Sequence, residues 1–223
     1  MPSHKIHLSI AKRVNDKLNL DLDLDSIMLG SVLPDICKSR NHSISHYQVG
    51  EKDLEGLANP DKFIKKYKNK LNNPIMMGYL IHILTDRYYN EYMFKHFYIY
   101  DEDDNGIGMY LKGKKKLLDG KTRKYLKHRE LELYDKWLIN NGYVPKFNDM
   151  NCVDNVIDFE EAKFNKEKIR EYILSANKDI DKVNIFSKFR FYNYKITTKE
   201  ELDRIYNNCI NYILDYIENK LSR

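Results

Sequence analysis

The sequence contains few of the residues that form tight turns, with nine glycines and five prolines among 223 residues. Sandwiches and barrels built from many short strands need such turns, so the composition argues against those folds. The hydrophobic share of 42% is enough for a globular core at this length. No repeat or linker divides the chain, and we therefore expect a single domain over residues 1–223.

Cysteines and long apolar runs are also scarce. The three cysteines, Cys37, Cys152 and Cys209, are widely spaced and form no C-x-x-C motif, which indicates no disulfide framework. No window approaches 18 uninterrupted apolar residues, and the first residues hold no apolar run of signal-peptide length. We expect a cytoplasmic protein without a transmembrane segment. Nothing in the sequence indicates an oligomeric state.

The charge balance is modestly basic, with 38 Lys and Arg against 33 Asp and Glu. A net charge of +5 is compatible with an anionic substrate but is not diagnostic of one. Basic residues gather in residues 112–129, where a solvated face is the simplest interpretation. The other interpretation is a patch that attracts phosphate-bearing partners, so nucleic acid is not excluded. Within this stretch, Asp119-Gly120 is a pair typical of a hairpin turn.

Apolar residues recur at helical spacing through most of the chain, first over residues 4–18. Further helices are expected over residues 61–71, 74–96, 127–141, 159–180 and 197–221. A short helix capped by Asp25 or Ser26 should end before Pro34. Thr198 and Glu201 have the spacing of a capping box. The sequence therefore predicts an all-α, single-domain multi-helix bundle.

His82 and Asp86 stand out in the longest apolar segment, because they lie four residues apart on one helical face among apolar neighbours. Burying an imidazole and a carboxylate without partners is costly, so they either satisfy each other or bind a cation. Zinc takes both ligand types. His7, Asp35 and His46 are further candidates from other segments, and a helix bundle can bring such ligands together between its helices.

Each of these residues also has a simpler explanation. A single histidine such as His7 on a half-buried helix is more often structural than a ligand, and Asp35 after a proline suits an ordinary turn. The combination of several such residues in order is more informative than any one of them. Four segments carry it: His7-x-x-x-Ala11, Gly30-Ser31-x-x-Pro34-Asp35, Ser45-His46-Tyr47 and Gly78-Tyr79-Leu80-x-His82-x-x-x-Asp86.

In these four segments the chain resembles the zinc-dependent phospholipase C family, which is related to the single-strand-specific zinc nucleases. The resemblance implies an all-helical fold with between one and three zinc ions. It implies that Asp35, His46, His82 and Asp86 hold the first ion, and that Asp86 bridges to a second ion contacted by His7. It also implies phosphodiester hydrolysis, with Asp35 and Asp86 acting in catalysis and a phosphate ester as substrate, phospholipid being one candidate.

The chain departs from this family in two places. The family's secreted members bind metal through an N-terminal tryptophan, whereas the single tryptophan here is Trp137. The family also supplies a later histidine and a His-x-x-x-Glu or His-x-x-x-Asp pair. The candidates here are His96, His128 and Glu132, with Glu130 or Asp135 as substitutes for Glu132. His96 lies ten residues beyond Asp86, about 15 Å along an unbroken helix, so it joins the cluster only if the helix ends early.

Two other functions compete with this one. A phosphohydrolase of the HD type needs an adjacent His-Asp pair, and that dipeptide does not occur in the sequence. A non-catalytic helical metal-binding module is the stronger alternative. In that case the His and Asp residues hold one structural metal or bond to one another, and the basic residues 112–129 bind anionic lipid or nucleic acid.

Overall fold

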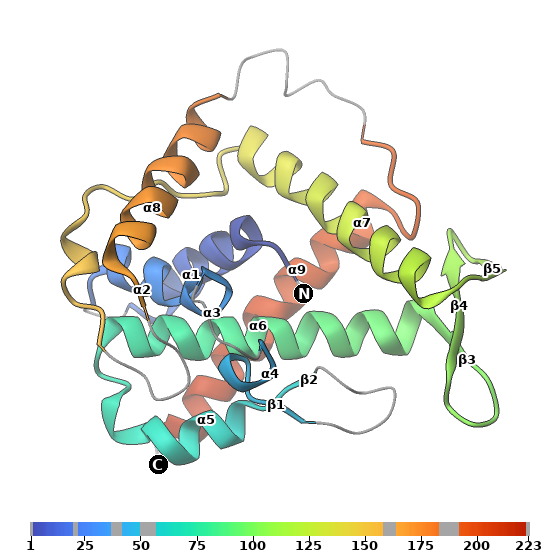
Figure 1. Ribbon diagram of the computed structural model, residues 1–223, viewed down its shortest axis with the longest axis horizontal. Coiled ribbons are helices and arrows are strands. Elements are labelled where there is room, and N and C mark those ends of the chain that lie inside the picture. Colours follow the sequence, from blue (N-terminus) through green and yellow to red (C-terminus); the bar gives the residue numbers. More distant parts are fainter. Residues whose placement is uncertain are drawn as a thin grey trace.

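The computed structural model describes residues 2–19, 22–36, 42–49, 57–157, 164–182 and 192–221, and these are mostly helical (Figure 1). Short 3-10 turns occur at Lys68–Lys70 and Asn151–Val153. The helices are α1 (His4–Leu18), α2 (Leu24–Gly30), α3 (Leu33–Ile36), α4 (His42–Ser45), α5 (Pro60–Tyr67), α6 (Pro74–Phe97), α7 (Gly120–Asn140), α8 (Lys166–Asp181) and α9 (Lys199–Leu221).

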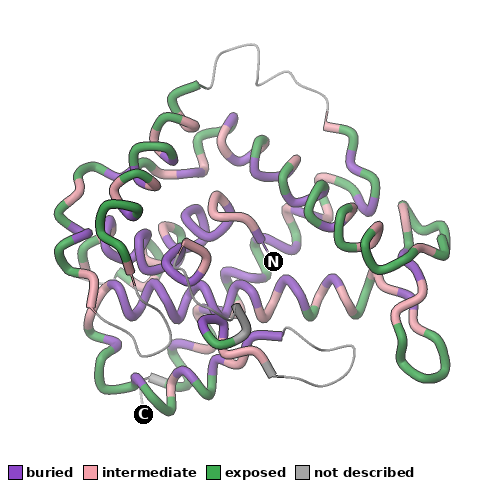
Figure 2. Tube along the Cα trace, viewed as in Figure 1, coloured by how far each residue is buried: buried purple, intermediate pink, exposed green. Residues whose placement is uncertain are grey.

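Helix α6 runs across the molecule and forms the centre of the fold (Figure 1). Asn73 caps its start by accepting hydrogen bonds from the backbone N–H groups of Ile75 and Met76, and Pro74 occupies its first turn. Every residue from Ile75 to Asp86 is buried, so this half of the helix is enclosed on all sides (Figure 2). Among the described helices, α1, α2, α3, α5 and α9 pack against it.

Two glycines allow α2 and α6 to approach closely. A Cβ atom on Gly78 would lie 2.0 Å from the Ile27 carbonyl oxygen, and one on Gly30 would lie 2.1 Å from the Ile75 carbonyl oxygen. Only glycine fits at such a crossing. The contact sets the position of Ser31, the residue after Gly30, relative to the turn of α6 that follows Gly78.

The prediction of an all-α fold is wrong in detail, because a small antiparallel sheet follows α6. Its strands are β3 (Tyr98–Tyr100), β4 (Gly106–Leu111) and β5 (Lys114–Leu117), paired in the order β3-β4-β5. A two-stranded pair, β1 (Gln48–Val49) with β2 (Leu57–Ala58), lies beside α6. The larger sheet begins directly at the end of α6 and packs Met109 against Met93 and Ile196.

The predicted hairpin turn at Asp119-Gly120 is also wrong. The β4–β5 turn is formed by Lys112 and Gly113, which have φ values of 49° and 77°, as the tightest hairpin turns require. Asp119 instead caps α7, where its carboxylate accepts from the backbone N–H and the hydroxyl of Thr122. This cap explains why α7 begins at Gly120 and not at residue 127.

Other helix starts differ by a few residues from those predicted. The cap of α2 is Asp23, whose carboxylate accepts from Ser26 N–H. The predicted cap Asp25 accepts from the backbone of Asn148 and Asp149 and so holds a distant loop. Thr198 caps α9 through the Glu201 N–H as predicted. The Glu201 carboxylate, however, bonds to Tyr92 and Arg204 and does not complete a capping box.

Two sequence expectations concern membranes and cysteines. Of the helices in the described ranges, none is both long and apolar enough to cross a bilayer. Cys152 and Cys209 are buried and carry free thiols, whereas Cys37 lies outside the described residues.

Replacing Gly78 by alanine should destabilise the protein by about 3 kcal/mol, because the new methyl group has to displace the Ile27 carbonyl and push α2 away from α6. Chemical denaturation measures the effect. Gly120→Ala is the matched control, because a Cβ there meets only the Arg123 side chain, at 3.6 Å. Equal stability of Gly78→Ala and the wild type would contradict this account of the crossing.

Candidate metal centre

Five of the predicted ligands converge at the centre of the fold, where α1 and the α3–α4 region meet α6. His7 comes from α1, Asp35 from α3, His46 from the turn after α4, and His82 and Asp86 from α6. The side chains of all three histidines are 0% exposed, that of Asp86 is 1% exposed and that of Asp35 is 10% exposed. The segments that carry them are far apart in sequence, so packing of the bundle creates the cluster.

The Asp86 carboxylate is the centre of this cluster. Its Oδ1 lies 3.4 Å from His7 Nε2, and its Oδ2 lies 3.4 Å from His82 Nε2 and 3.6 Å from His46 Nε2. Asp35 Oδ1 lies 3.2 Å from His46 Nε2. The His7 and His82 rings stack with their centroids 4.0 Å apart. Two sets of donor atoms are close enough to hold an ion: His7, Asp35 and His82, and His46, His82 and Asp86.

Neighbouring groups fix the orientation of two of the imidazoles. His82 Nδ1 donates to the Ser31 carbonyl oxygen at 2.8 Å, which turns Nε2 toward the cluster. His46 Nδ1 shares a 2.9 Å hydrogen bond with Ser45 Oγ, and the Tyr79 hydroxyl donates to the Ser45 carbonyl oxygen. Bonds of this kind on the far ring nitrogen are typical of metal-binding histidines. These hydrogen bonds also give a structural role to Ser31, Ser45 and Tyr79, which stand in the same four sequence segments as the histidines and aspartates.

Several buried nitrogen and oxygen atoms of the cluster have no hydrogen-bond partner among the described residues. They are both ring nitrogens of His7, His82 Nε2 and both carboxylate oxygens of Asp86. A buried polar atom left unpaired costs about 1–3 kcal/mol, and more if it is charged. So many unpaired nitrogen and oxygen atoms pointing at one another form a donor set that fits a bound cation, and the mixture of imidazole and carboxylate suits zinc.

Electrostatic effects within the cluster give its side chains different protonation states. Burial lowers the pKa of His7 to about 4, and His82 adds to this effect. Burial also lowers the pKa of His82, but the charges of Asp86 and Asp35 outweigh it and leave that pKa above its ordinary value. Burial raises the pKa values of Asp35 and Asp86, yet the neighbouring histidines hold both below the usual range. Both carboxylates are therefore ionised and His7 is neutral, the states in which they bind metal.

His4 joins the cluster although sequence analysis did not select it. Its Nε2 lies 3.6 Å from Asp35 Oδ2, and its side chain is 32% exposed, so the cluster reaches solvent at this point. The Tyr172 ring of α8 packs edge-on against the His4 ring with centroids 5.1 Å apart. The signal was the spacing: His4 stands three residues before His7 and therefore lies on the same face of α1.

The weaker predicted ligands stand apart from the cluster. Helix α6 continues unbroken to Phe97, so His96 lies about 15 Å beyond Asp86 along the helix, where it packs on Tyr92. His128 and Glu132 are exposed on α7, and Glu132 pairs with Arg129. Glu130, a proposed substitute, accepts from the backbone N–H groups of residues 195–197 and anchors the segment before α9.

Asp135, the other proposed substitute, contacts the start of α1. Its carboxyl group is hydrogen-bonded to the hydroxyl of Ser3, the residue that caps α1. Burial raises the pKa of this carboxyl to about 7, partly offset by the Ser3 hydrogen bond and by Lys5. Asp135 therefore links α7 to α1 and is not one of the donors around Asp86.

Replacing His82 by alanine should weaken zinc binding by more than about 100-fold. Loss of a group that only hydrogen-bonds to a metal ligand already lowers metal affinity by up to that factor. His96→Ala is the matched control, because it makes the same substitution on the same helix and should retain the metal. Elemental analysis and competition with a chelating dye measure both. Purified wild type without a stoichiometric transition metal, or equal zinc affinity in the two variants, would contradict the placement of the site.

The free energy of unfolding should depend on the ionisation of Asp135. Between pH 4 and 7 the unfolded chain loses this proton while the folded protein keeps it, so stability falls as the pH rises through this window. Asp135→Asn removes the effect. The free energy of unfolding of this variant, relative to that of the wild type, should be higher at pH 8 than at pH 5. The expected difference is about 3 kcal/mol, the energy that corresponds to two pKa units. Urea denaturation at both pH values tests this, with exposed Asp16→Asn as a control that should show no such difference.

The chain matches no protein-family model, no curated protein and no solved structure. Any assignment of function therefore depends on the geometry of its own residues. The four short segments singled out in the sequence are the same segments that supply His7, Asp35, His46, His82 and Asp86.

Proposed function

We propose that this chain is a metal-dependent phosphoesterase, with zinc as the metal, that hydrolyses a phosphodiester in the manner of a phospholipase C. The observation that carries the proposal is the set of unpaired donor atoms around the buried Asp86 carboxylate. The cost of burying these atoms is offset where they bind cations. The resemblance to zinc-dependent phospholipase C in the same residues supports zinc and phosphodiester hydrolysis.

The donor geometry limits how the ions are arranged. His82 has one nitrogen free to bind, because Nδ1 already donates to Ser31, so His82 serves a single ion. His46 and His82 approach the same oxygen of Asp86, whereas His7 approaches the other oxygen. If two ions bind, His46, His82 and Asp86 would hold one of them, and His7 and Asp86 would hold the other.

Bound zinc supplies a Lewis acid and lowers the pKa of its water toward neutrality. The chain's own residues provide the rest of the site. Asp35 and His4 are the donors nearest to solvent, so a phosphate ester would approach from their side. The apolar α6 residues Ile81, Ile83 and Leu84 are fully buried and exclude water from the inner face of the cluster.

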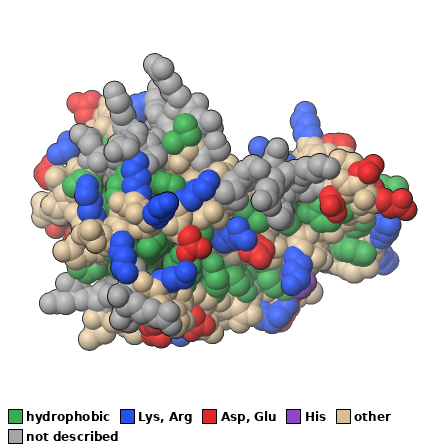
Figure 3. Space-filling view, turned by 90° about the horizontal axis from the view of Figure 1, so that it is seen from below, with side chains coloured by type: hydrophobic (Ala, Val, Ile, Leu, Met, Phe, Trp, Pro, Cys, Tyr) green, Lys and Arg blue, Asp and Glu red, His purple; other side chains and the backbone are tan. Residues whose placement is uncertain are grey.

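Substrate class is open between a phospholipid, a nucleic acid and a small phosphodiester. On the face shown in Figure 3, Lys and Arg side chains are interspersed with Asp and Glu and do not form one continuous basic track. A long polyanion binds through many cationic contacts, so this face gives no preference for nucleic acid. All three classes belong in an activity screen.

The extreme burial of the cluster favours one competing function, a non-catalytic module with a structural metal. His7, His46 and His82 have no exposed side-chain surface, and structural zinc sites are closed in this way. Turnover distinguishes the two functions, since a closed structural site binds metal without hydrolysing substrate.

Zinc-loaded protein should hydrolyse at least one of three substrates: bis-p-nitrophenyl phosphate, phosphatidylcholine vesicles and a single-stranded oligonucleotide. Asp86→Asn should lower kcat/KM by about 1,000-fold or more, because loss of the metal removes several kcal/mol of transition-state stabilisation. Asp16→Asn, the same substitution on the exposed face of α1, should leave the rate unchanged. Stoichiometric zinc with no turnover of any substrate would contradict the enzyme and support the structural module.

A further inference from the structure

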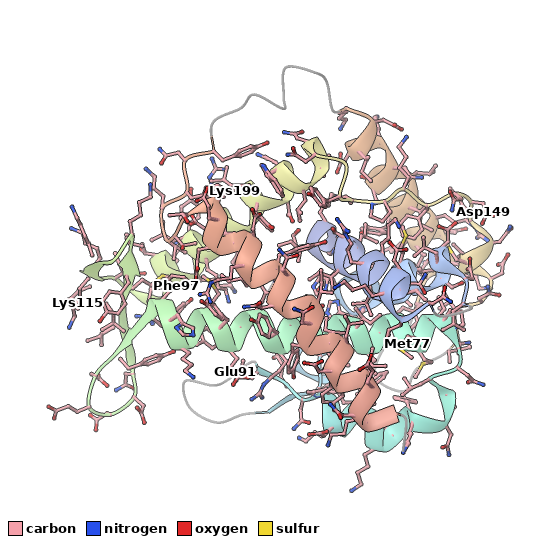
Figure 4. The ribbon with its side chains drawn as sticks, turned by 180° about the vertical axis from the view of Figure 1, so that it is seen from behind. Met77, Glu91, Phe97, Lys115, Asp149 and Lys199 are labelled. Atoms are coloured by element: carbon pink, nitrogen blue, oxygen red, sulfur yellow. The ribbon has the colours of Figure 1, made fainter. Side chains whose placement is uncertain are left out.

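A cavity of about 380 Å³ lies between α1, α7 and α9. It shares helix α1 with the His/Asp cluster, but none of the cluster's residues lines it. Its volume is at the lower end of the range found for small-molecule sites. Lys199, at the start of α9, marks its position in Figure 4.

Positive charge predominates in this cavity. Three cations line it, Arg13, Lys17 and Lys199, against the single carboxylate of Asp203. That carboxylate is already engaged, because Lys199 Nζ donates to one oxygen and the Tyr134 hydroxyl donates to the other at 3.0 Å. Within the described part of the chain, no carboxylate forms an ion pair with Arg13 or Lys17. Two positive charges at the cavity are therefore left without a partner of opposite sign.

Flat aromatic side chains form the wall beside these cations. The Trp137 and Tyr143 rings stack with centroids 5.3 Å apart. The Arg13 guanidinium lies 5.2 Å from the Tyr143 ring centroid, and Lys199 Nζ lies 3.9 Å from the Trp137 ring centroid. These ring faces hold the cations at the cavity. Buried Leu138 and Ile210 supply aliphatic surface in the same cavity.

We propose that this cavity binds a phosphate monoester of a small, flat organic group. A phosphate monoester carries close to two negative charges at neutral pH and so matches the two unpaired cations, whereas a carboxylate offers one charge. Its organic group would lie against the aromatic and aliphatic wall. The site is separate from the His/Asp cluster, and it does not depend on the proposed phosphoesterase function.

Trp137 is the single tryptophan of the chain, so tryptophan fluorescence reports on this cavity directly. Phenylphosphonate is the probe, because its C–P bond resists the hydrolysis that a phosphoesterase would catalyse. Benzenesulfonate has the same ring with one charge, and methylphosphonate keeps the phosphonate but lacks the ring. Phenylphosphonate should change the fluorescence saturably and bind at least about tenfold more tightly than either comparator, with calorimetry as a second measurement.

Arg13→Gln and Lys17→Gln should each weaken phenylphosphonate binding at least about tenfold. Lys12→Gln is the matched control, because Lys12 lies on the same helix but pairs with Asp16 and does not line the cavity. Both cations to be tested are exposed, so their loss should leave the fold intact. Equal loss of affinity in Lys12→Gln, or equal affinity for phenylphosphonate and benzenesulfonate, would overturn the proposal.

Binding should persist with the same affinity after zinc is removed and in the His82→Ala variant. Loss of phenylphosphonate binding in either case would place the probe at the His/Asp cluster and overturn the cavity assignment. Absence of both a fluorescence change and a calorimetric signal would overturn it as well. A failed activity screen would leave this result unaffected, so the two proposals fail separately.

Discussion

Burying the Asp86 carboxylate among apolar helices carries a desolvation cost of several kcal/mol, which charges placed around it must offset. Three imidazoles approach its two oxygens at 3.4–3.6 Å, and they come from α1, α6 and the turn after α4. The packing of these elements is thus tied to one buried charge. The charges of Asp86 and Asp35 raise the pKa of His82 and so favour its protonated form, with which a metal would compete.

The position of the cluster depends in turn on a backbone contact that involves no polar side chain. The glycines at the α2–α6 crossing bring the Ser31 carbonyl within 2.8 Å of His82 Nδ1. That bond fixes the ring so that Nε2 points at Asp86. A residue with no side chain therefore governs the orientation of a proposed metal ligand, which explains why Gly30 and Gly78 stand in the same short segments as Asp35 and His82.

Much of this arrangement could be predicted from sequence because it depends on local spacing. The periodicity of Ile6, Ile10 and Val14 predicts α1 with the bounds observed, and the four-residue spacing of His82 and Asp86 predicts their shared face. The features that could not be predicted depend on tertiary contacts. The β4–β5 turn at Lys112-Gly113 has little sequence signal, and Asp25 was misassigned as a cap because its partners lie more than 120 residues away. The candidate ligand His96 could be assessed only once the unbroken length of α6 was known, and His128 only once α7 was known to leave it exposed.

All of the clustered donors lie between His4 and Asp86, whereas α9, which packs on α6, is made more than a hundred residues later. On the ribosome this interval lasts on the order of ten seconds. During that time the nascent chain already holds every imidazole and carboxylate of the cluster, while the apolar face of α6 that α9 will cover stays bare. The order of synthesis thus opens a period in which an ion can enter before the last helix closes over α6, and in which the uncovered helix is most exposed to aggregation.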